Sequence, residues 1–457
     1  MHVFKDIFLD DSKIAFDKAH RRTINFNIDR YDEAVKRGNS RYKNMELAKQ
    51  RASYIKSKVV SNLAGYLEEF EKNAVKNGIE VIWARDEKEA FTEIEKILKA
   101  CEAKILVKSK SMLSEEIELN ENLKKAGVEP VETDLGEFIV QLAGEKPYHI
   151  LTPAMHKSKE DVAKLFHEKF ETSPDSSPEE LTVFVRKKLR EKFLSAETGI
   201  TGANFLIADV GGVALTENEG NGLMSTAFPK VHIVIAGIEK ILPSVNDLQL
   251  FLPLLAAKGT GQQVTVYNSL FTGPKKKEED NGPEKMVVIL LDNKRTDIAR
   301  EKDVVQALKC IRCGACLNIC PVYKNIGGYT YNTTYSGPIG SVITPWLKGF
   351  KPYGHLSHAS TICGACTGVC PVKIPLHYLL LLNRKKSVEK RQGHWTWNKG
   401  IKIWKLLAKK RGNVDFVNGK IKNQALELNR KILGNQKQMP PFAKDSFSKI
   451  WKSSNLK

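Results

Sequence analysis

Two copies of one cysteine pattern constrain this chain more than any other feature. The segment "CIRCGACLNICPV" at 310–322 returns fifty positions later as "STICGACTGVCPV" at 360–372. Ser360 stands in the second copy where the first has Cys310. Seven of the eight cysteines lie in these two copies. Such clustering, with two-residue gaps, indicates metal ligation in a reducing cytosol and not the spaced staples of a secreted disulfide protein.

The spacing C-x2-C-x2-C-x3-C-P is typical of a bacterial [4Fe–4S] site, and in two-cluster ferredoxins the fourth cysteine ligates the other cluster. CxxC pairs also build zinc sites, but zinc binding gives no reason for the C-x3-C-P endings. We therefore predict two [4Fe–4S] clusters. The predicted ligands are Cys310, Cys313, Cys316 and Cys370 for cluster one, and Cys320, Cys363 and Cys366 for cluster two.

Cluster two lacks a fourth cysteine, and three interpretations stay open. Ser360 can supply an alkoxide oxygen, a water or substrate oxygen can bind the iron, or the cluster can rest as [3Fe–4S]. His355 and His358 lie nearby in sequence, but a plain loop role is the simpler assignment for both. The eighth cysteine, Cys101 in "LKACEAKILV", is predicted to be a small buried apolar side chain.

The charge of the chain is concentrated at its C-terminal end. Residues 383–457 contain 20 Lys and Arg against 4 Asp and Glu, so they hold +16 of the net +19. Within them, "HWTWNKGIKIWKLLAKKR" mixes tryptophans with cations. This mixture suits docking to a protein partner first, with a merely solvated helix as an equal alternative and an anionic membrane or nucleic acid after these. No helix-turn-helix or RNA-binding signature accompanies the charge, which argues against nucleic acid.

Alternating apolar runs and helical periods before the cysteines predict a largely parallel sheet with helices on its faces. Strands are expected at 78–84, 103–109, 128–134, 148–154 and 285–293, with more strands through 199–270. Helices are expected at 1–75, 90–100, 114–127 and 135–144, and a helical segment at 295–309 leads into the cysteines. Residues 326–354, rich in Gly, Tyr, Thr and Pro, are expected to be a long irregular connection. No window approaches 18 apolar residues and the N-terminus is not of signal-peptide type, so a cytoplasmic protein without a membrane span is expected.

Polar residues gather near expected strand ends, where α/β folds bind ligands. These residues are Thr201, Asn204, Asp209, Glu217 and Asn221. We interpret them as a candidate small-molecule or partner site. In "VKSKSMLSEE", Ser111 or Ser114 is expected to cap a helix, with an anion site on Lys108 and Lys110 as the alternative. No catalytic triad or flavin fingerprint is legible, so the catalytic residues stay unknown and the chemical step can lie on another subunit.

Long stretches of the chain resemble the lactate utilization protein B family. They include "KSKSMLSEEIELN", "VETDLGEFIVQL", "HILTPAMHKSKEDVAKLF" and "GITGANFLIADVGGVALTENEGN", besides both cysteine motifs. The resemblance implies an α/β LUD domain like the ribose-5-phosphate isomerase and CoA-transferase group, then an α-helical dicluster ferredoxin domain and a basic, mostly helical tail. It also implies that three cysteines in the second motif are a feature of the family.

The resemblance further implies two partners, a second iron–sulfur protein with cysteine-rich repeats and another LUD-domain protein, which together oxidise L-lactate to pyruvate. The expected organisation is a helical segment at 1–75, the LUD domain at 76–296, the dicluster domain at 297–382 and the basic segment at 383–457. An electron-transfer subunit of that complex is the first hypothesis. An iron–sulfur subunit acting on another 2-hydroxy acid, and an iron–sulfur regulatory or nucleic-acid-binding protein, are the alternatives.

Overall fold

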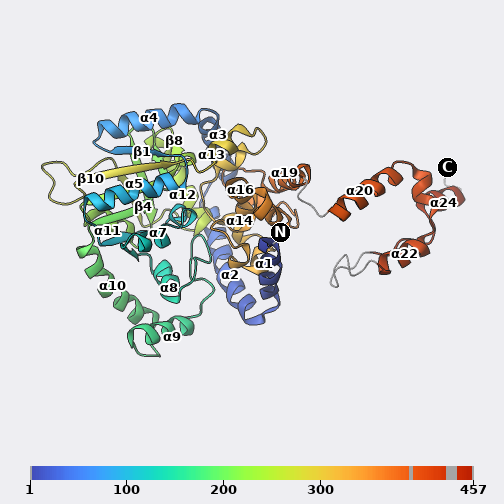
Figure 1. The fold of residues 1–457 in the computed structure, drawn as a ribbon, viewed down its shortest axis with the longest axis horizontal. Coiled ribbons are helices and arrows are strands. Elements are labelled where there is room, and N and C mark those ends of the chain that lie inside the picture. Colours follow the sequence, from blue (N-terminus) through green and yellow to red (C-terminus); the bar gives the residue numbers. More distant parts are fainter. Residues whose placement is uncertain (1–2, 391–394, 429–439, 455–457) are drawn as a thin grey trace. The chain divides into compact units, whose positions relative to one another are not determined.

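The structure, a computed structural model, describes residues 3–390, 395–428 and 440–454, and of residues 395–398 it describes the backbone alone. The chain divides into two compact units, Met1–Ser387 and Val388–Lys457 (Figure 1). The first unit holds both cysteine motifs and every strand of the described residues.

The N-terminal segment is helical, as its sequence predicts. Its helices are α1 (Val3–Asp11), η1 (Ser12–Phe16), α2 (Lys18–Ser40), α3 (Met45–Ser61) and α4 (Leu63–Lys76). Helix α2 begins where the Asp17 carboxylate accepts hydrogen bonds from the backbone N–H groups of Ala19 and His20. These bonds satisfy donors that the first turn of a helix leaves free. On its inner face α2 buries Ile24 and Ile28 completely.

A six-stranded parallel sheet forms the centre of the first unit, in the order β1-β10-β7-β4-β2-β3 (Figure 1). Its strands are β1 (Glu80–Ala84), β2 (Ile105–Lys108), β3 (Glu129–Glu132), β4 (Thr198–Gly202), β7 (Val231–Gly237) and β10 (Lys285–Leu291). The parallel arrangement, predicted from the alternation of strands and helices, is confirmed. It brings the C-terminal ends of all six strands to one edge of the sheet.

Both faces of this sheet are buried, because neighbouring residues of a strand point to opposite faces. Ile233 and Ile235 pack in one apolar cluster with the helix α5 (Glu87–Ala100). Val234 and Ala236 pack in another cluster with α4. Strands covered on both faces read as continuous apolar runs, which is why "KVHIVIAG" and "KMVVILL" were legible as strands.

A second sheet of four strands, in the order β8-β5-β6-β9, joins the apolar cluster on the α4 side. Its strands are β5 (Phe205–Ile207), β6 (Gly212–Glu217), β8 (Ile241–Leu242) and β9 (Tyr267–Phe271). β6 is antiparallel to both β5 and β9, whereas β8 runs parallel to β5. The other helices of this α/β region are α6 (Met112–Glu116), α7 (Leu119–Lys125), α8 (Leu135–Ala143), α9 (Lys159–Phe170), α10 (Pro178–Ser195), α11 (Asn221–Ala227), η2 (Ile238–Lys240), η3 (Val245–Asp247), α12 (Leu248–Gly259) and α13 (Arg295–Arg300).

The strand expected at 148–154 was wrong. These residues form bends and turns outside both sheets. The imidazole of His149 accepts hydrogen bonds at Nδ1 from the backbone N–H groups of Leu151 and Thr152, at 3.1 and 3.4 Å. A side chain that binds its own following backbone competes with a strand ladder, and a short apolar run does not reveal that competition.

The cysteine region is mainly helical and contains one helix that the sequence did not predict. Its elements are η4 (Val305–Lys309), α14 (Ala315–Asn318), α15 (Tyr323–Ile326), η5 (Tyr329–Tyr331), α16 (Gly337–Leu347), α17 (Phe350–Tyr353), η6 (Gly354–His358), α18 (Ala365–Val369) and α19 (Leu376–Glu389). Helix α16 lies inside the expected irregular connection, which was therefore wrong. Pro338 is compatible with a first helical turn, and almost every residue of α16 is buried.

Helix α19 crosses the expected start of the basic segment at Asn383. Asn383 is buried, donates from Nδ2 to Val342 O at 2.8 Å and accepts at Oδ1 from the indole N–H of Trp346. Arg384 donates to Ser357 O at 2.9 Å and to Ser360 O at 3.0 Å. The first residues of the basic segment are thus bonded within the first unit.

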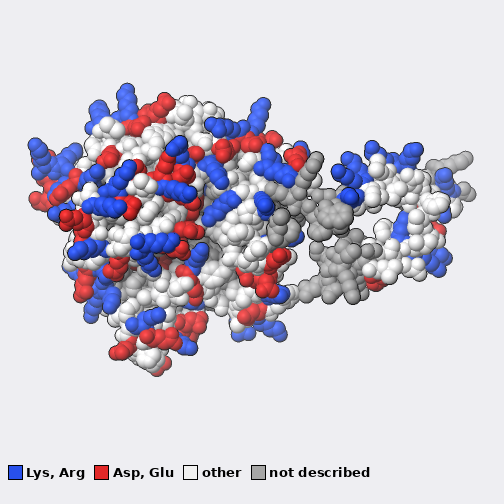
Figure 2. All heavy atoms as spheres, in the orientation of Figure 1, with Lys and Arg blue, Asp and Glu red and all other residues white. Residues whose placement is uncertain are grey.

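The second unit consists of short helices with many cationic side chains. They are α20 (Trp395–Ala408), α21 (Arg411–Phe416), α22 (Gly419–Leu428) and α24 (Phe447–Ser453). Figure 2 shows far more Lys and Arg than Asp and Glu on the face of this unit in view. Ile403, Trp404 and Leu407 of α20 are exposed. Residues 391–394 of the tryptophan-rich stretch lie outside the described residues, and no described helix is long and apolar enough to cross a membrane.

Candidate metal centre

The two cysteine motifs fold into the same loop. Arg312 and Ile362, at matching positions, both have left-handed backbones, with φ of 60° and 56°. Gly314 and Gly364, two residues further on, have φ of 76° and 80°, a conformation that glycine adopts without steric cost. A short helix follows each glycine, α14 in the first motif and α18 in the second. The sequence repeat is therefore a structural repeat.

Ser360 is the structural counterpart of Cys310. The backbone N–H of Arg312 donates to Cys310 Sγ at 3.4 Å, and the backbone N–H of Ile362 donates to Ser360 Oγ at 3.1 Å. The same i+2 contact therefore holds both side chains on the same side of their loops. Ser360 is half-buried, and its hydroxyl stands where a fourth thiol of the second motif would stand.

Four cysteines from both motifs act on one another electrostatically. Burial raises the pKa of Cys316 well above its usual value, and charge on Cys310, Cys313 and Cys370 raises it further. Burial also raises the pKa of Cys370, and Cys310 adds to this effect. Cys370 therefore lies with the first motif, although it belongs to the second copy. These four thiols are the predicted ligands of cluster one, and that role stays a prediction.

The other three cysteines form a second electrostatic group. Burial raises the pKa of Cys366 to about 11, with Cys320 as the next cause and Cys363 as a smaller one. Cys320 ends the first motif, and it reaches the second because α14 packs against α18. Cys101 lies apart from both groups, half-buried, with Sγ 3.3 Å from Thr198 Oγ1.

The residues present suit iron–sulfur clusters. Thiols of two distant segments converge, and backbone N–H groups point at sulfur, as where Ile374 donates to Cys370 Sγ at 3.3 Å. Such hydrogen bonds stabilise an electron-rich cluster. The guanidinium of Arg312 lies close to Cys310, since the charge of Cys310 is the first cause after burial that acts on the pKa of Arg312 and raises it.

A buried chain of charges connects the α/β region to the first motif. The Arg295 guanidinium donates to Glu116 Oε2 at 2.8 Å and to Glu239 Oε2 at 2.7 Å, and Arg312 Nη2 donates to Glu239 Oε1 at 3.3 Å. Burial alone raises the pKa of Glu239, but the charges of Arg295 and Arg312 outweigh it, so the pKa falls to about 2. The Tyr335 hydroxyl donates to Glu116, and Arg312 lies over the Tyr335 ring at 4.4 Å.

A cavity of about 280 Å³ adjoins this chain of charges. It opens at the C-terminal ends of β2, β4 and β7, where parallel sheets place ligands. Its lining includes Lys110, Asn204, Glu219, Lys240, Arg312 and Tyr335. Arg312 belongs to the first cysteine motif, so the cavity lies between the sheet edge and the predicted first cluster.

The candidate small-molecule residues divide between this cavity and other roles. Asn204, Glu217 and Asn221 line the cavity. Thr201 lies outside the lining, where its hydroxyl forms a hydrogen bond of 2.8 Å with His232 Nε2. Asp209 accepts from the backbone N–H of Val245. The sequence thus located the right edge of the sheet but not the full set of side chains on it.

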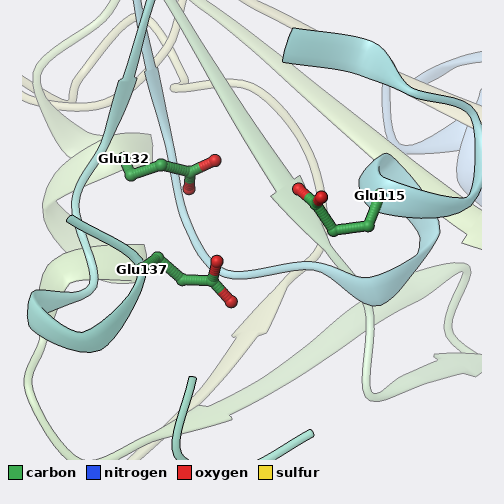
Figure 3. A group of neighbouring side chains, drawn as sticks. All are labelled: Glu115, Glu132 and Glu137. Carbon is green, nitrogen blue, oxygen red and sulfur yellow. The ribbon is translucent and has the colours of Figure 1, made fainter. Parts of the chain in front are cut away.

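The segment "VKSKSMLSEE" caps a helix, as predicted, and also contributes to a buried acidic cluster. Ser111 is the N-cap of α6. Carboxylate oxygens of Glu115, Glu132 and Glu137 lie within 4.8 Å of one another (Figure 3). The Lys108 ammonium is 2.8 Å from Glu132 and 3.6 Å from Glu115. An ammonium group therefore offsets part of the charge of this cluster, and burial raises the pKa of Glu132 and of Glu137.

The two histidines near the second motif lie in the short helix η6, whereas the sequence suggested a loop. His355 packs its ring against Phe8 at 5.3 Å, and burial lowers its pKa to about 4. His358 is exposed. Among the described residues, neither histidine shares a hydrogen bond with a cysteine of the motif.

Comparison with known proteins finds two family models that match the chain. Residues 67–291 match the LUD domain, and residues 306–374 match the 4Fe–4S dicluster domain. Lactate utilization protein B of Bacillus velezensis is 44% identical over 348 residues, which cover 76% of this chain and 73% of the relative. The protein of the same name from Bacillus subtilis strain 168 is also 44% identical, over 76% of this chain and 72% of its own.

The chain belongs to the lactate utilization protein B family. Another relative, the "uncharacterized electron transport protein YkgF" of Escherichia coli K12, is 42% identical over 342 residues, 75% of this chain and 72% of its own. The crystal structure of a duf162 family protein from Deinococcus radiodurans aligns with 50% of this chain and 98% of its own at 14% identity. Its TM-score of 0.29 is too low to establish a shared fold, so the likeness to isomerases and CoA-transferases stays a prediction.

Sequence reasoning missed the cations beside the first motif in this family member. Lys240 lines the cavity, and burial lowers its pKa to about 8. The sequence pattern assigned no role to Arg312 beyond its place between two cysteines, and none to Arg295 beyond its place in the helical segment before them. The one legible signal was the position of Arg312 inside the motif, because a side chain between two ligands must lie close to them.

Proposed function

We propose that this protein is the iron–sulfur electron-transfer subunit of a cytosolic complex that oxidises L-lactate to pyruvate. The observation that carries the proposal is that thiols of the two distant motifs lie close enough to act on one another, Cys370 on Cys316 and Cys320 on Cys366. Two clusters of this kind each carry one electron, which matches a reaction that releases two electrons from each lactate. The names of the relatives, which refer to lactate utilization and to electron transport, support both halves of the proposal.

In this proposal each cluster takes ligands from both motifs. The ligands are Cys310, Cys313, Cys316 and Cys370 for a [4Fe–4S] cluster one, and Cys320, Cys363 and Cys366 for cluster two. The fourth position of cluster two faces Ser360. That cluster is therefore either a [4Fe–4S] cluster with an oxygen ligand or a [3Fe–4S] cluster. The partners are a second iron–sulfur protein and another LUD-domain protein.

A deletion strain tests the proposal most directly. Loss of the gene should abolish growth on L-lactate, and the parent chain should restore it. Cys316→Ser should fail to restore growth, because Cys316 lies among the other three thiols of its group. Cys101→Ser is the matched control and should restore growth fully, since Cys101 lies apart from both groups.

The same strain separates lactate from other hydroxy acids. Growth on D-lactate and on glycolate should be unchanged by the deletion. A strain that loses growth on glycolate but keeps it on L-lactate would instead identify an oxidoreductase for another 2-hydroxy acid. Anaerobic purification of the tagged full chain should recover an iron–sulfur partner and a LUD-domain partner, and recovery of the chain alone at low salt contradicts the proposed complex.

A further inference from the structure

The cavity beside the first motif contains two cationic groups with unused hydrogen-bond donors. Arg312 Nη1 is buried, and no described residue accepts a hydrogen bond from it. Lys240 forms neither a hydrogen bond nor an ion pair with any described residue, and its nearest charges are those of Arg312, Glu239, Cys310 and Arg295. Arg312 is paired with Glu239 through Nη2, and Lys240 is half-buried, so the unused donors are Arg312 Nη1 and the Lys240 ammonium. A buried donor left unsatisfied is costly, so these two groups favour an anion in the cavity.

Arg295 provides the contrast within the same cavity. Its guanidinium is saturated by Glu116 and Glu239, and it also donates to Asp292 O at 3.1 Å. Glu239 is shared between Arg295 and Arg312, and its oxygens are taken up by those two partners. The network therefore satisfies Arg295 but leaves donors of Lys240 and Arg312 for something that enters the cavity.

The rest of the lining restricts what can enter. The volume of about 280 Å³ is at the lower limit of small-molecule pockets, which run from about 300 to 1,000 Å³. The lining also contains a group of three carboxylates, from Asp134, Glu217 and Glu219. Burial raises the pKa of Glu219, and the charge of Asp134 raises it further. The cations can bind the negative end of a small ligand, and the carboxylates would repel a second negative charge at its other end.

We propose that this cavity binds a small monocarboxylate of the 2-hydroxy or 2-oxo acid class, with its carboxylate held by Lys240 and Arg312. The ligand class rests on the proposed function, whereas the requirement for a small anion rests on the two cations. Asn204, whose Oδ1 is fixed by the backbone N–H of Thr216 at 2.9 Å, has Nδ2 left to donate to the oxygen on the second carbon. The proposal assigns binding alone.

Calorimetric titration of the full chain, reconstituted anaerobically with iron and sulfide, tests this site. L-lactate and pyruvate should bind, and 1,2-propanediol, which lacks the carboxylate, should not. Lys240→Met should weaken lactate and pyruvate binding about tenfold or more, since a hydrogen bond to a charged group is lost. Lys240→Arg should retain binding. Lys302→Met, at an exposed lysine, is the matched control and should bind like the parent.

Two results overturn the proposal. The first is a Lys240→Met variant that binds lactate and pyruvate as tightly as the parent. The second is a parent chain that binds neither lactate nor pyruvate. Unchanged binding by Lys240→Met together with a shifted reduction potential of cluster one would assign the two cations to the cluster. Iron content and the EPR spectrum establish that each variant has assembled its clusters. Neither result touches the electron-transfer role, which the growth tests with Cys316→Ser decide separately.

Discussion

The two cysteine motifs share one loop conformation but lie in different surroundings. A Cβ on Gly314 would meet Ile150 Cγ2 at 3.1 Å and Leu151 Cδ1 at 3.2 Å, whereas a Cβ on Gly364 would meet nothing within 4 Å. Cys313 is 7% exposed, but its counterpart Cys363 is an exposed residue. The first motif is packed against the α/β region, whereas the loop of the second exposes Cys363 although Cys366 and Cys370 are buried.

This difference shows how one repeated motif can serve two ends of an electron path. Backbone geometry is set within the loop, by the positive φ of Gly314 and Gly364, so both copies can present thiols in the same way. Burial and charge are set by what packs around the loop. Under the proposed function, the first cluster faces the cavity and the second faces solvent, where a partner can approach.

The largest expected effect comes from removing the cysteine that crosses between the motifs. Cys370→Ser should destroy cluster one, which it completes, although Cys370 lies in the second copy. Iron content should fall by about half, because one of two clusters is lost. EPR of the reduced variant provides the measurement, and an intact first cluster with only the second altered would falsify the crossed arrangement.

Oxidation should act next most strongly, and unequally on the two clusters. As proposed, cluster two has an exposed cysteine and Ser360 at its fourth position, and oxygen should bind iron there less tightly than thiolate does. Mild oxidation should release about one iron per chain and convert cluster two to [3Fe–4S], while cluster one stays cubic. Loss of cluster one first, seen by EPR during titration with oxidant, contradicts this order.

Making the second motif match the first should remove much of that inequality. Ser360→Cys adds a thiol in the position that corresponds to Cys310, so cluster two should resist the same oxidant. Ser360→Ala is the control and should remain at least as labile as the parent. If oxidative stability and EPR spectrum of Ser360→Cys both equal those of the parent, residue 360 does not face the cluster.

A smaller effect is expected from the helix that supports the second motif. Arg384 donates to Ser357 O and Ser360 O, and loss of such charge-assisted bonds costs about 1.5–3 kcal/mol each at most. Arg384→Ala should therefore speed iron release from cluster two and leave cluster one unchanged. Lys302→Ala, at an exposed position, should change neither rate. Equal acceleration at both clusters would mean that α19 supports the whole region.

The smallest effect on the clusters should come from the largest deletion. Removing residues 388–457 takes away the second unit but no cysteine, so iron content and both EPR signals should match the full chain. Recovery of partners should fall, and in the full chain it should weaken as salt shortens the Debye length below ~8 Å. Full recovery of partners by the truncated chain at physiological salt rules out docking by this unit.

The sequence predicted those parts of the fold that depend on local pattern. The strands β7 and β10 were legible because their residues are apolar on both faces. The strand expected at 148–154 failed because His149 binds the backbone that follows it. Helix α16 was missed because Gly337 and Pro338 resemble a loop, whereas its burial among other helices makes it a helix.

The candidate site likewise contains residues that the sequence predicted and residues that it did not. Cysteine spacing suggested the two ligand sets, since that spacing reflects the geometry of a cluster. The charged neighbours could not be predicted, because Glu116, Lys240, Arg295 and Arg312 come from separate segments that only the fold brings together. No local periodicity records a buried ion pair between residues 179 positions apart.

The buried chain of charges makes the cysteine region inseparable from the rest of the first unit. Glu239 accepts from Arg312 of the first motif with its carboxylate, and its backbone oxygen accepts from Lys56 of α3 at 2.6 Å. Three regions of the chain thus meet at one residue. A cysteine region transplanted to another protein would take Arg312 away from its carboxylate, and the scaffold left behind would keep a buried anion short of one cation. The cysteine region and the α/β region are therefore expected to be stable only together.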